Sequence, residues 1–439
     1  MNRRTFARHL LASPALLSSL SSAALSGLCA SLASAAKAAD SPGPGLDNEV
    51  DALLKTHFVI DAAPSDTFFP HSKAAPPQFN PNAILGLIGG AVLGIGPITG
   101  QVPTFLPEDS LLRKSTLATP HIGLKPLLDG PHAVERTLGE IEATYQAVNA
   151  HPHRAGVALS AGDMEALHRA GKLALVLGLD TGYEIGNDLA VLDAYHRLGL
   201  RKLAVTHEVA PSWAESDTSD RPTGLQPFGR EVIAECNRLG VMVDISHSSD
   251  LTFWGVLTCA RRPVIATHSG ARQVAPVARN LGDDMIRALA KNGGFIGVGG
   301  ILNQQTVEKA NNSGHHYQDA VLGALWLQDK YPDPEAFAEA WYDPAKQEEA
   351  RKALNMASFP SVGTILTDPE STLAHLDYIT NLIGFDHVGI GTDLLMSWAP
   401  LYPNMIRGIA AGLITRKYSE EKIAKILGGN FLRVFRDNA

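Results

Sequence analysis

Histidine and aspartate side chains recur at one kind of position in this chain, at the end of a short apolar run. The runs LALVLGLD, KLAVTH, VMVDISH, PVIATH and VGIGTD end at Asp180, His207, His247, His268 and Asp393. Imidazole nitrogens and carboxylate oxygens are ligands that Zn²⁺ and similar transition metals take in proteins. Such an ion lowers the pKa of a bound water towards neutrality, which supplies a nucleophile for hydrolysis. The pattern therefore predicts a metal-dependent hydrolase.

Other classes of protein lack support in the sequence. It contains no GxSxG elbow, no GxGxxG dinucleotide fingerprint and no Walker loop, the signatures of serine hydrolases, dehydrogenases and NTPases. The formal net charge of −8 gives no attraction for nucleic acid or for an anionic membrane surface. We expect a small molecule as the partner, and no nucleic acid.

The elements that must position these residues are short strands that alternate with amphipathic helical segments. Eight runs are apolar almost throughout: His57–Asp61, Gly156–Ser160, Leu173–Asp180, Lys202–His207, Val241–His247, Pro263–His268, Gly294–Gly299 and Val388–Asp393. Strands of this kind are buried on both faces, which favours a (β/α)₈ TIM-type barrel, with an open doubly wound sheet as the competitor. In a barrel the carboxyl ends of all strands meet at one mouth, so the histidines and aspartates would converge there.

Two connections are longer than a simple barrel needs, and we interpret them as insertions after the first and the seventh strand. The first, residues 62–154, contains the apolar stretch Ala83–Thr99, which is nearly long enough to span a membrane. Its five glycines and one proline make a poor helix, so we expect no transmembrane span in the mature chain. The stretch is either packed within the insertion or a contact surface for a second copy, which would make a homodimer.

The N-terminus has the composition of an export signal. Arg3 and Arg4 precede an apolar stretch rich in serine and alanine, and small residues follow up to Ala38. We predict that residues 1–38 are a cleaved twin-arginine signal, with a general secretory signal as the alternative. Residues 39–439 would then be a single periplasmic or secreted domain. Cys236 and Cys259 remain after cleavage and are expected to be free thiols.

Five segments together resemble the membrane (renal-type) dipeptidase family, peptidase family M19. They are VMVDISHSS, PVIATHSGAR, ARNLGDDMI, DHVGIGTD and the terminal GGNFLRVF, and the similarity runs from about residue 57 to residue 435. The resemblance implies a (β/α)₈ barrel with two zinc ions bridged by a carboxylate. It also implies cleavage of dipeptides that carry a free C-terminal carboxylate.

The resemblance assigns roles to five residues at matching positions. His247 and His268 match the two histidines on the second metal, and Asp180 stands where the family has a bridging glutamate. Asp393 matches the acidic residue that faces the substrate amino group and the reacting centre. Arg279 matches the arginine that pairs with the substrate carboxylate, a role suited to a planar guanidinium.

Three departures from the family pattern surround the expected site. The first strand of the family ends in His-x-Asp, whereas here Pro64 replaces the histidine and Asp66 matches the aspartate. The bridging side chain of Asp180 is one methylene shorter than glutamate. Tyr183 replaces a histidine that polarises the scissile carbonyl, although a tyrosine can still donate a hydrogen bond to an oxyanion. We therefore expect an altered site with one or two zinc ions. Four other imidazoles are predicted to pack against neighbouring side chains or to be solvated: those of His71, His207, His315 and His316. Of these, His207 or a histidine of an insertion is a candidate to replace the missing metal ligand.

Three hypotheses of function remain at the level of sequence. The first is a hydrolase of dipeptides or similar small amides with a free carboxylate, in which Asp393 handles the proton and Arg279 binds the carboxylate. The second is a catalytically weak or inactive family member that acts as a binding protein, because the first-strand histidine is missing. The third is a hydrolase of lactones or phosphoesters, although the His-x-His expected on its first strand is absent.

Overall fold

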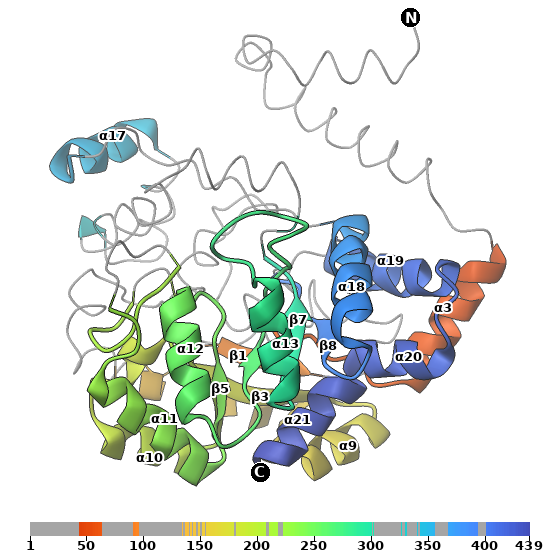
Figure 1. Ribbon diagram of the computed structural model, residues 1–439, viewed down its shortest axis with the longest axis horizontal. Helices are drawn as coiled ribbons and strands as arrows, with labels where there is room; N and C mark the ends of the chain where they lie inside the picture. The colour runs from red at the N-terminus through yellow and green to blue at the C-terminus, as the bar shows by residue number, and fades with distance from the viewer. Residues whose placement is uncertain are drawn as a thin grey trace, which may run out of the picture. The chain divides into compact units, whose positions relative to one another are not determined.

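In a computed structural model of the chain, a parallel β-sheet that curls on itself carries the candidate site (Figure 1). The structure describes residues 44–63, 91–95, 155–179, 181–207, 210–217, 223–300, 302, 343–355, 368–393 and 401–439, together with isolated positions in 134–153, 326–331 and 340. Residues Val50–Ala439 belong to one compact unit, and the following description concerns that unit.

The strands of the sheet pair in the order in which they occur along the chain. Seven of them pair parallel with their neighbours: β2 (Ala155–Val157), β3 (Leu173–Leu179), β4 (Leu200–Ala204), β5 (Met242–Asp244), β6 (Ile265–Ala266), β7 (Phe295–Val298) and β8 (Val388–Ile390). The first predicted strand joins β8 through a parallel bridge between Asp61 and Ile390. The α/β fold with a curled parallel sheet is thus confirmed.

One strand was not predicted. β1 (Ala91–Ile95) lies within the glycine-rich apolar stretch and pairs antiparallel with β3. An extended segment is consistent with the expectation that these glycines form a poor helix. The rest of that stretch lies outside the described residues, as do the predicted export signal and most of the two predicted insertions.

The strands end earlier than the sequence pattern suggests. His207, His247 and Asp393 each lie three residues beyond the last strand residue, and His268 lies two beyond. His247 and Asp393 have backbone φ angles of 65° and 55°, a left-handed conformation that cannot continue a strand. These four residues therefore lie on the loops that leave the strands, not on the strands themselves.

Close approach of the backbones at β6, β7 and β8 requires glycine. A Cβ atom on Gly297 would lie 2.0 Å from the Thr267 carbonyl oxygen, and one on Gly391 would lie 1.7 Å from the same atom. A side chain at either position would separate the strand ends. These glycines bring the ends of the three strands together near His268 and Asp393.

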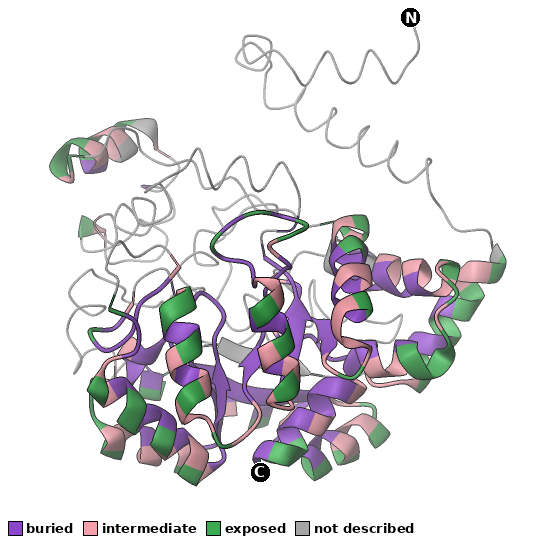
Figure 2. Ribbon diagram, viewed as in Figure 1, coloured by how far each residue is buried: buried purple, intermediate pink, exposed green. Residues whose placement is uncertain are grey.

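Helices flank the sheet, and neighbours along the chain contact one another from α10 to α13. Their bounds, with those of two single-turn helices, are α3 (Pro44–Thr56), α9 (Ala161–Arg169), η2 (Gly182–Ile185), α10 (Leu189–Arg197), α11 (Pro227–Leu239), α12 (Asp250–Cys259), α13 (Asp283–Lys291), α17 (Pro344–Ala353), α18 (Pro369–Ile383), α19 (Leu401–Thr415), α20 (Glu420–Ala424), η3 (Lys425–Gly429) and α21 (Asn430–Asn438). Figure 2 shows the strands buried and the helices exposed on their outer faces. Within the described part of the chain, we find no helix with the length and apolarity of a membrane span.

Sequence signals explain where several helices begin and end. Ser249 caps α12 by accepting a hydrogen bond from the Thr252 N–H, and Asp368 caps α18 in the same way. α11 begins with Pro227 and ends at Gly240, whose φ of 76° is left-handed. α12 follows the loop that leaves the carboxyl end of β5, so the Ser249 cap also helps to fix the geometry of the loop that carries His247.

The C-terminal segment packs under the first and last strands. The Asn430 side chain donates to the carbonyl oxygens of Phe385 (2.6 Å) and Val388 (2.8 Å), at the start of β8. The Ile60 N–H donates to the Leu427 carbonyl oxygen at 2.7 Å. Phe431 meets Phe295 of β7 edge to face. The terminal GGNFLRVF block therefore has a defined structural role at the end of the sheet opposite the site.

Candidate active site

Two buried imidazoles meet at the carboxyl ends of β5 and β6. Nε2 of His247 lies 3.1 Å from Nε2 of His268, and the two rings are 5.0 Å apart at an interplanar angle of 63°. Two nitrogens bound to one tetrahedral zinc at 2.0–2.1 Å would be about 3.3–3.4 Å apart. The pair therefore has the spacing of two ligands on one ion.

The environment of His268 keeps its ring neutral. Burial lowers its pKa well below the usual value, and the nearby charges of Arg279, His247, Lys202 and His207 lower it further. A neutral imidazole has a nitrogen lone pair available, which is the form that binds a metal. The residues present thus fit a metal ion at this position.

A third imidazole belongs to the same cluster: His207, for which the sequence left a packing role and a role as replacement ligand both open. The ring of His207 stacks on that of His247 with centroids 4.2 Å apart and planes inclined by 27°. The in-plane lone pairs of two nearly parallel, stacked rings lie in separate planes, so His207 and His247 are poorly arranged to share one ion. His207 is better placed to hydrogen-bond a ligand beside the pair. Its position after an apolar run, like those of His247 and His268, was the available signal.

Arg279 brings a positive charge to the same region. It is 7% exposed, and Nη1 donates to the Ser269 hydroxyl at 3.0 Å. Nη2 is buried and makes no hydrogen bond to the residues that the structure describes. Asp283 and Asp284 follow Arg279 by four and five residues and would be within reach of a surface ion pair. Arg287 forms contacts of 3.9 Å and 3.6 Å with those two carboxylates instead.

Asp393 lies close to Arg279 across a glycine. A Cβ atom on Gly300 would be 4.0 Å from Nη2 of Arg279 and 4.0 Å from Oδ2 of Asp393, so the two groups are less than about 8 Å apart. The Asp393 N–H donates to the Ala63 carbonyl oxygen at 3.0 Å, which ties the residue to the end of the first strand. A carboxylate and a guanidinium therefore flank one point above β7.

The other predicted site residues are placed only in part. Tyr183 lies half-buried on η2, directly after β3. Asp66 and Asp180 lie outside the described residues, as does Pro64. Among the positions that are described, no three His, Cys, Asp or Glu side chains form a group that would hold a metal ion. The histidine pair is therefore the described part of the predicted metal site.

The loop that carries Arg279 is held from two sides. Asn280 accepts a hydrogen bond from the Gly270 N–H and donates to the Ala275 carbonyl oxygen, both at 2.9 Å. From α18, His375 accepts from the Ala271 N–H through Nδ1 at 2.8 Å, and its Nε2 contacts the Leu302 carbonyl oxygen at 2.8 Å. The loop is thus fixed by buried hydrogen bonds and does not depend on a ligand for its shape.

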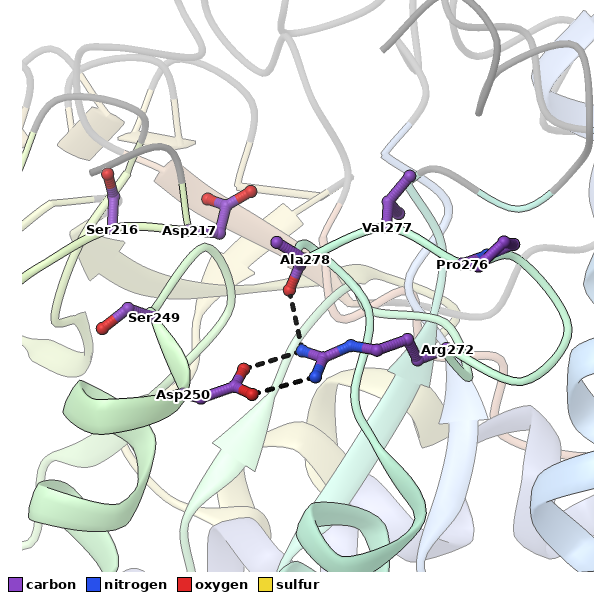
Figure 3. A pocket seen from close by; sticks show the side chains of 8 residues that line it. All are labelled: Ser216, Asp217, Ser249, Asp250, Arg272, Pro276, Val277 and Ala278. Carbon is purple, nitrogen blue, oxygen red and sulfur yellow. Dashed lines mark hydrogen bonds and ion pairs between the residues drawn. The ribbon is translucent and has the colours of Figure 1, made fainter. Parts of the chain in front are cut away.

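A cavity of about 380 Å³ opens beside this loop (Figure 3). Its lining includes Asp217, whose carboxylate oxygen lies 3.9 Å from Nδ1 of His247. Arg272 also lines it, and there the guanidinium is paired twice with Asp250, at 2.7 Å and 2.9 Å, and donates to the Ala278 carbonyl oxygen at 3.1 Å. Of the two arginines on the loop, Arg272 is neutralised by a carboxylate, whereas Arg279 has none of the described carboxylates in hydrogen-bonding contact.

The two remaining cysteines are free, as predicted. Cys236 is fully buried on α11, and burial raises the pKa of its thiol far above the usual value. Cys259 is half-buried at the end of α12 and lies 3.4 Å from a guanidinium nitrogen of Arg230. Within the described part of the chain, neither thiol is hydrogen-bonded to a histidine of this cluster.

Comparison with known sequences gives a single family. The sequence model of the membrane dipeptidase family (peptidase family M19) matches residues 101–439. The dipeptidase tcpJ of Claviceps purpurea is 28% identical over 317 residues, which is 70% of this chain and 61% of that protein. The match thus spans less than two thirds of the length of that relative.

Solved structures share the fold. The probable dipeptidase PvdM from Pseudomonas aeruginosa superposes with a TM-score of 0.60 at 22% identity, covering 90% of this chain and 99% of that chain. A metallo peptidase from Rhodobacter sphaeroides, solved with a phosphinate mimic of the dipeptide L-Ala-D-Ala, gives a TM-score of 0.52 at 21% identity, covering 71% of this chain and 76% of that chain.

Proposed function

Because the chain belongs to the membrane dipeptidase family, peptidase family M19, we propose that it hydrolyses dipeptides, or similar small amides with a free carboxylate, with the help of a metal ion. Its full architecture would be the (β/α)₈ barrel, with the curled sheet closed between the first strand and β2. The dipeptide mimic bound to the Rhodobacter sphaeroides metallo peptidase supports this class of substrate.

The observation that carries the proposal is the buried guanidinium of Arg279. A buried cation with a donor left over is costly unless a ligand completes its hydrogen bonds. Nη2 faces the region of Asp393 and His268 and has no hydrogen-bond partner among the described residues. A substrate carboxylate fits this donor in charge and geometry.

The other residues have roles that follow from their chemistry. His247 and His268 would hold the metal, with Asp66 and Asp180 as the further ligands. When bound, the metal would polarise the scissile carbonyl and lower the pKa of a water molecule. Asp393 would accept the proton of the attacking water and deliver it to the leaving amine.

Two side chains are candidates to stabilise the charge that develops on the carbonyl oxygen. His207 stacks beside the metal-binding pair and could donate a ring N–H. Tyr183 follows β3 on η2 and could donate its hydroxyl hydrogen. Removing one such donor typically lowers kcat by about 10²–10³-fold. His207→Phe and Tyr183→Phe, measured separately, would show which residue has this role.

Metal analysis combined with a dipeptide panel tests the proposal. We expect a protein purified with Zn²⁺ to contain fewer than two tightly bound ions per chain and to cleave dipeptides. His268→Asn should lose both the metal and the activity. Two stoichiometric zinc ions would contradict the expected loss of a site. Bound metal without turnover of any dipeptide would support the inactive binding protein instead.

The remaining features of the proposal concern regions that lie largely outside the described residues. Residues 1–38 would be a twin-arginine signal that sends the domain 39–439 to the periplasm. The part of the stretch Ala83–Thr99 outside β1 would be packed within the insertion or would form a contact surface for a second copy. N-terminal sequencing of the exported protein and its mass in solution would test these two points.

A further inference from the structure

A buried carboxylate lies one hydroxyl group away from the ring of His268. Asp244, at the end of β5, is completely buried, and its Oδ2 accepts a hydrogen bond from the Thr267 hydroxyl at 2.6 Å. The Thr267 oxygen in turn lies 2.9 Å from Nδ1 of His268. The three side chains therefore form a chain of contacts that runs from the interior of the sheet to the histidine pair.

The carboxylate of Asp244 is ionised despite its burial. Burial alone would raise its pKa, but the ammonium of Lys202 and the hydrogen bonds from Thr267 and Ser246 lower it below the usual value. Lys202 is itself 1% exposed, with Nζ 3.4 Å from Oδ2 of Asp244. An ionised carboxylate can only accept hydrogen bonds.

Because the Asp244 carboxylate can only accept, it determines the direction of the hydrogen bonds from Asp244 through Thr267 to His268. The Thr267 hydroxyl has one hydrogen, and Asp244 takes it at 2.6 Å. The Thr267 oxygen is then left to accept from Nδ1 of His268, which must carry the ring hydrogen. Nε2 of His268 keeps its lone pair and faces Nε2 of His247.

We propose that Asp244 is a positioning residue that acts through the Thr267 hydroxyl to fix the Nδ1–H tautomer and the ring orientation of His268, so that Nε2 is presented as a metal ligand. The inference rests on the proposed function, because it takes a metal ion to be what Nε2 binds. Partners of this kind on the second ring nitrogen are common where histidine binds a metal, and their loss costs about 10–100-fold in affinity.

Asp244 also has a structural task, which a test must separate from the positioning role. Its Oδ1 accepts from the N–H groups of Ser246 and Thr267, both at 3.0 Å, and so joins the ends of β5 and β6. The chain offers a matched control for this task. Asp61 accepts from both the N–H and the hydroxyl of Thr392, joining the first strand to β8. Thr392 precedes Asp393, whereas Thr267 precedes His268. The same two hydrogen bonds between threonine and aspartate therefore exist at Thr392 without an imidazole beside the threonine oxygen.

The experiment is to observe the ring nitrogens of His268 by NMR in the metal-free full chain with ¹⁵N-labelled histidine. The signals are assigned by their loss in His268→Asn. We expect the Nδ1–H tautomer in the wild type and in Thr267→Ser. In Asp244→Asn, the new amide would donate to the Thr267 oxygen, turn the hydroxyl hydrogen towards Nδ1, and shift the ring to the Nε2–H tautomer. In Thr267→Val the preference should be lost.

Affinity for Zn²⁺ alone, measured by competition with a chelator, gives the second readout. Thr267→Val and Asp244→Asn should each weaken Zn²⁺ binding by about 10–100-fold, whereas Thr267→Ser keeps the hydroxyl and should keep the wild-type affinity. Thr392→Val should lower stability without changing the His268 tautomer or the affinity. An unchanged His268 tautomer in both Asp244→Asn and Thr267→Val would overturn the inference. So would a change of tautomer or of Zn²⁺ affinity in Thr392→Val as large as that in Thr267→Val.

The two proposals can fail separately. A wild-type protein that binds no Zn²⁺ would contradict the proposed function, while the tautomers of the metal-free protein would still decide the role of Asp244. If Asp244→Asn does not fold, the comparison of Thr267→Val with Thr267→Ser decides the role alone.

Discussion

At the scale of single residues, the site differs from a surface cluster because its charged and polar groups are buried with their orientation already fixed. Arg279 is held by Ser269, and His268 by Thr267. Groups that are oriented before the substrate arrives need no reorganisation during the reaction. A substitution here should therefore change binding of one specific part of the substrate, with little effect on the other parts.

Arg279→Lys and Arg279→Ala test this expectation. Each should raise KM for substrates with a free carboxylate by about 10- to 100-fold, because a hydrogen bond to a charged group contributes about 1.5–3 kcal/mol. C-terminally amidated versions of the same substrates should lose much less. Steady-state kinetics on matched pairs of substrates measures the difference. Equal losses on both would show that Arg279 only supports its own loop, and Arg272→Lys serves as the control for the loop.

At the scale of elements, the loop after β6 depends on helix α18, although about a hundred residues separate them in sequence. His375 on α18 is the link, since it contacts the backbone of both Ala271 and Leu302. Burial lowers the pKa of His375, and its hydrogen bond to the Leu302 carbonyl oxygen opposes this only in part. The ring is therefore neutral in the folded protein over a wider pH range than in the unfolded chain.

The sign of the effect on stability follows from this lowered pKa. The unfolded chain binds a proton at His375 near pH 6.5, while the folded protein does not until a lower pH. The contribution is thus fully present above about pH 6.5 and is lost as the pH falls through the lowered value. His375→Gln keeps one donor and one acceptor without a titrating group. Urea unfolding between about pH 8 and pH 5 should show wild type losing more stability than the variant on acidification. Parallel losses in the two proteins would contradict the assignment.

The elements themselves were largely predictable from sequence, because runs that are apolar throughout are typical of strands buried on both faces. The convergence of His247, His268 and Arg279 followed from the same parallel arrangement. The position of His207 after an apolar run placed it at the end of a strand, but the sequence could not predict that its ring stacks on that of His247. The role of Asp244 was also missed, although a charged residue within the run VMVDISH, and another within KLAVTH at Lys202, were visible signs of a buried pair.

At the scale of the whole sheet, one buried carboxylate adds to the backbone hydrogen bonds that join the first and last strands. Asp61 is 1% exposed and accepts three hydrogen bonds from the described residues: from the Ala63 N–H, the Thr392 N–H and the Thr392 hydroxyl. The two bonds from Thr392 join residues more than three hundred positions apart in sequence. The junction therefore forms only when both ends of the domain are folded.

Asp61→Ala should be strongly destabilising, because it leaves three buried donors unsatisfied. We expect a loss of about 3 kcal/mol or more in the free energy of unfolding, at about 1–3 kcal/mol per donor. Asp61→Asn keeps one oxygen for the two N–H groups and should lose only about 1 kcal/mol. Chemical denaturation of the two variants gives the comparison. A small loss in Asp61→Ala would show that water replaces the carboxylate and that the junction is open to solvent.

The left-handed backbone at positions 247 and 393 limits which mutations evolution or an engineer can use there. Asparagine, aspartate and histidine enter this conformation several times more often than other residues with side chains, and most of the others incur roughly 1–2 kcal/mol. Of the side chains that bind metals, cysteine and glutamate are therefore disfavoured at position 247 before coordination chemistry is considered. In a library with all twenty amino acids at this position, folded members should be enriched in histidine, asparagine, aspartate and glycine. The backbone conformation at position 247 therefore limits which side chains can occur there, and the metal selects only among those side chains.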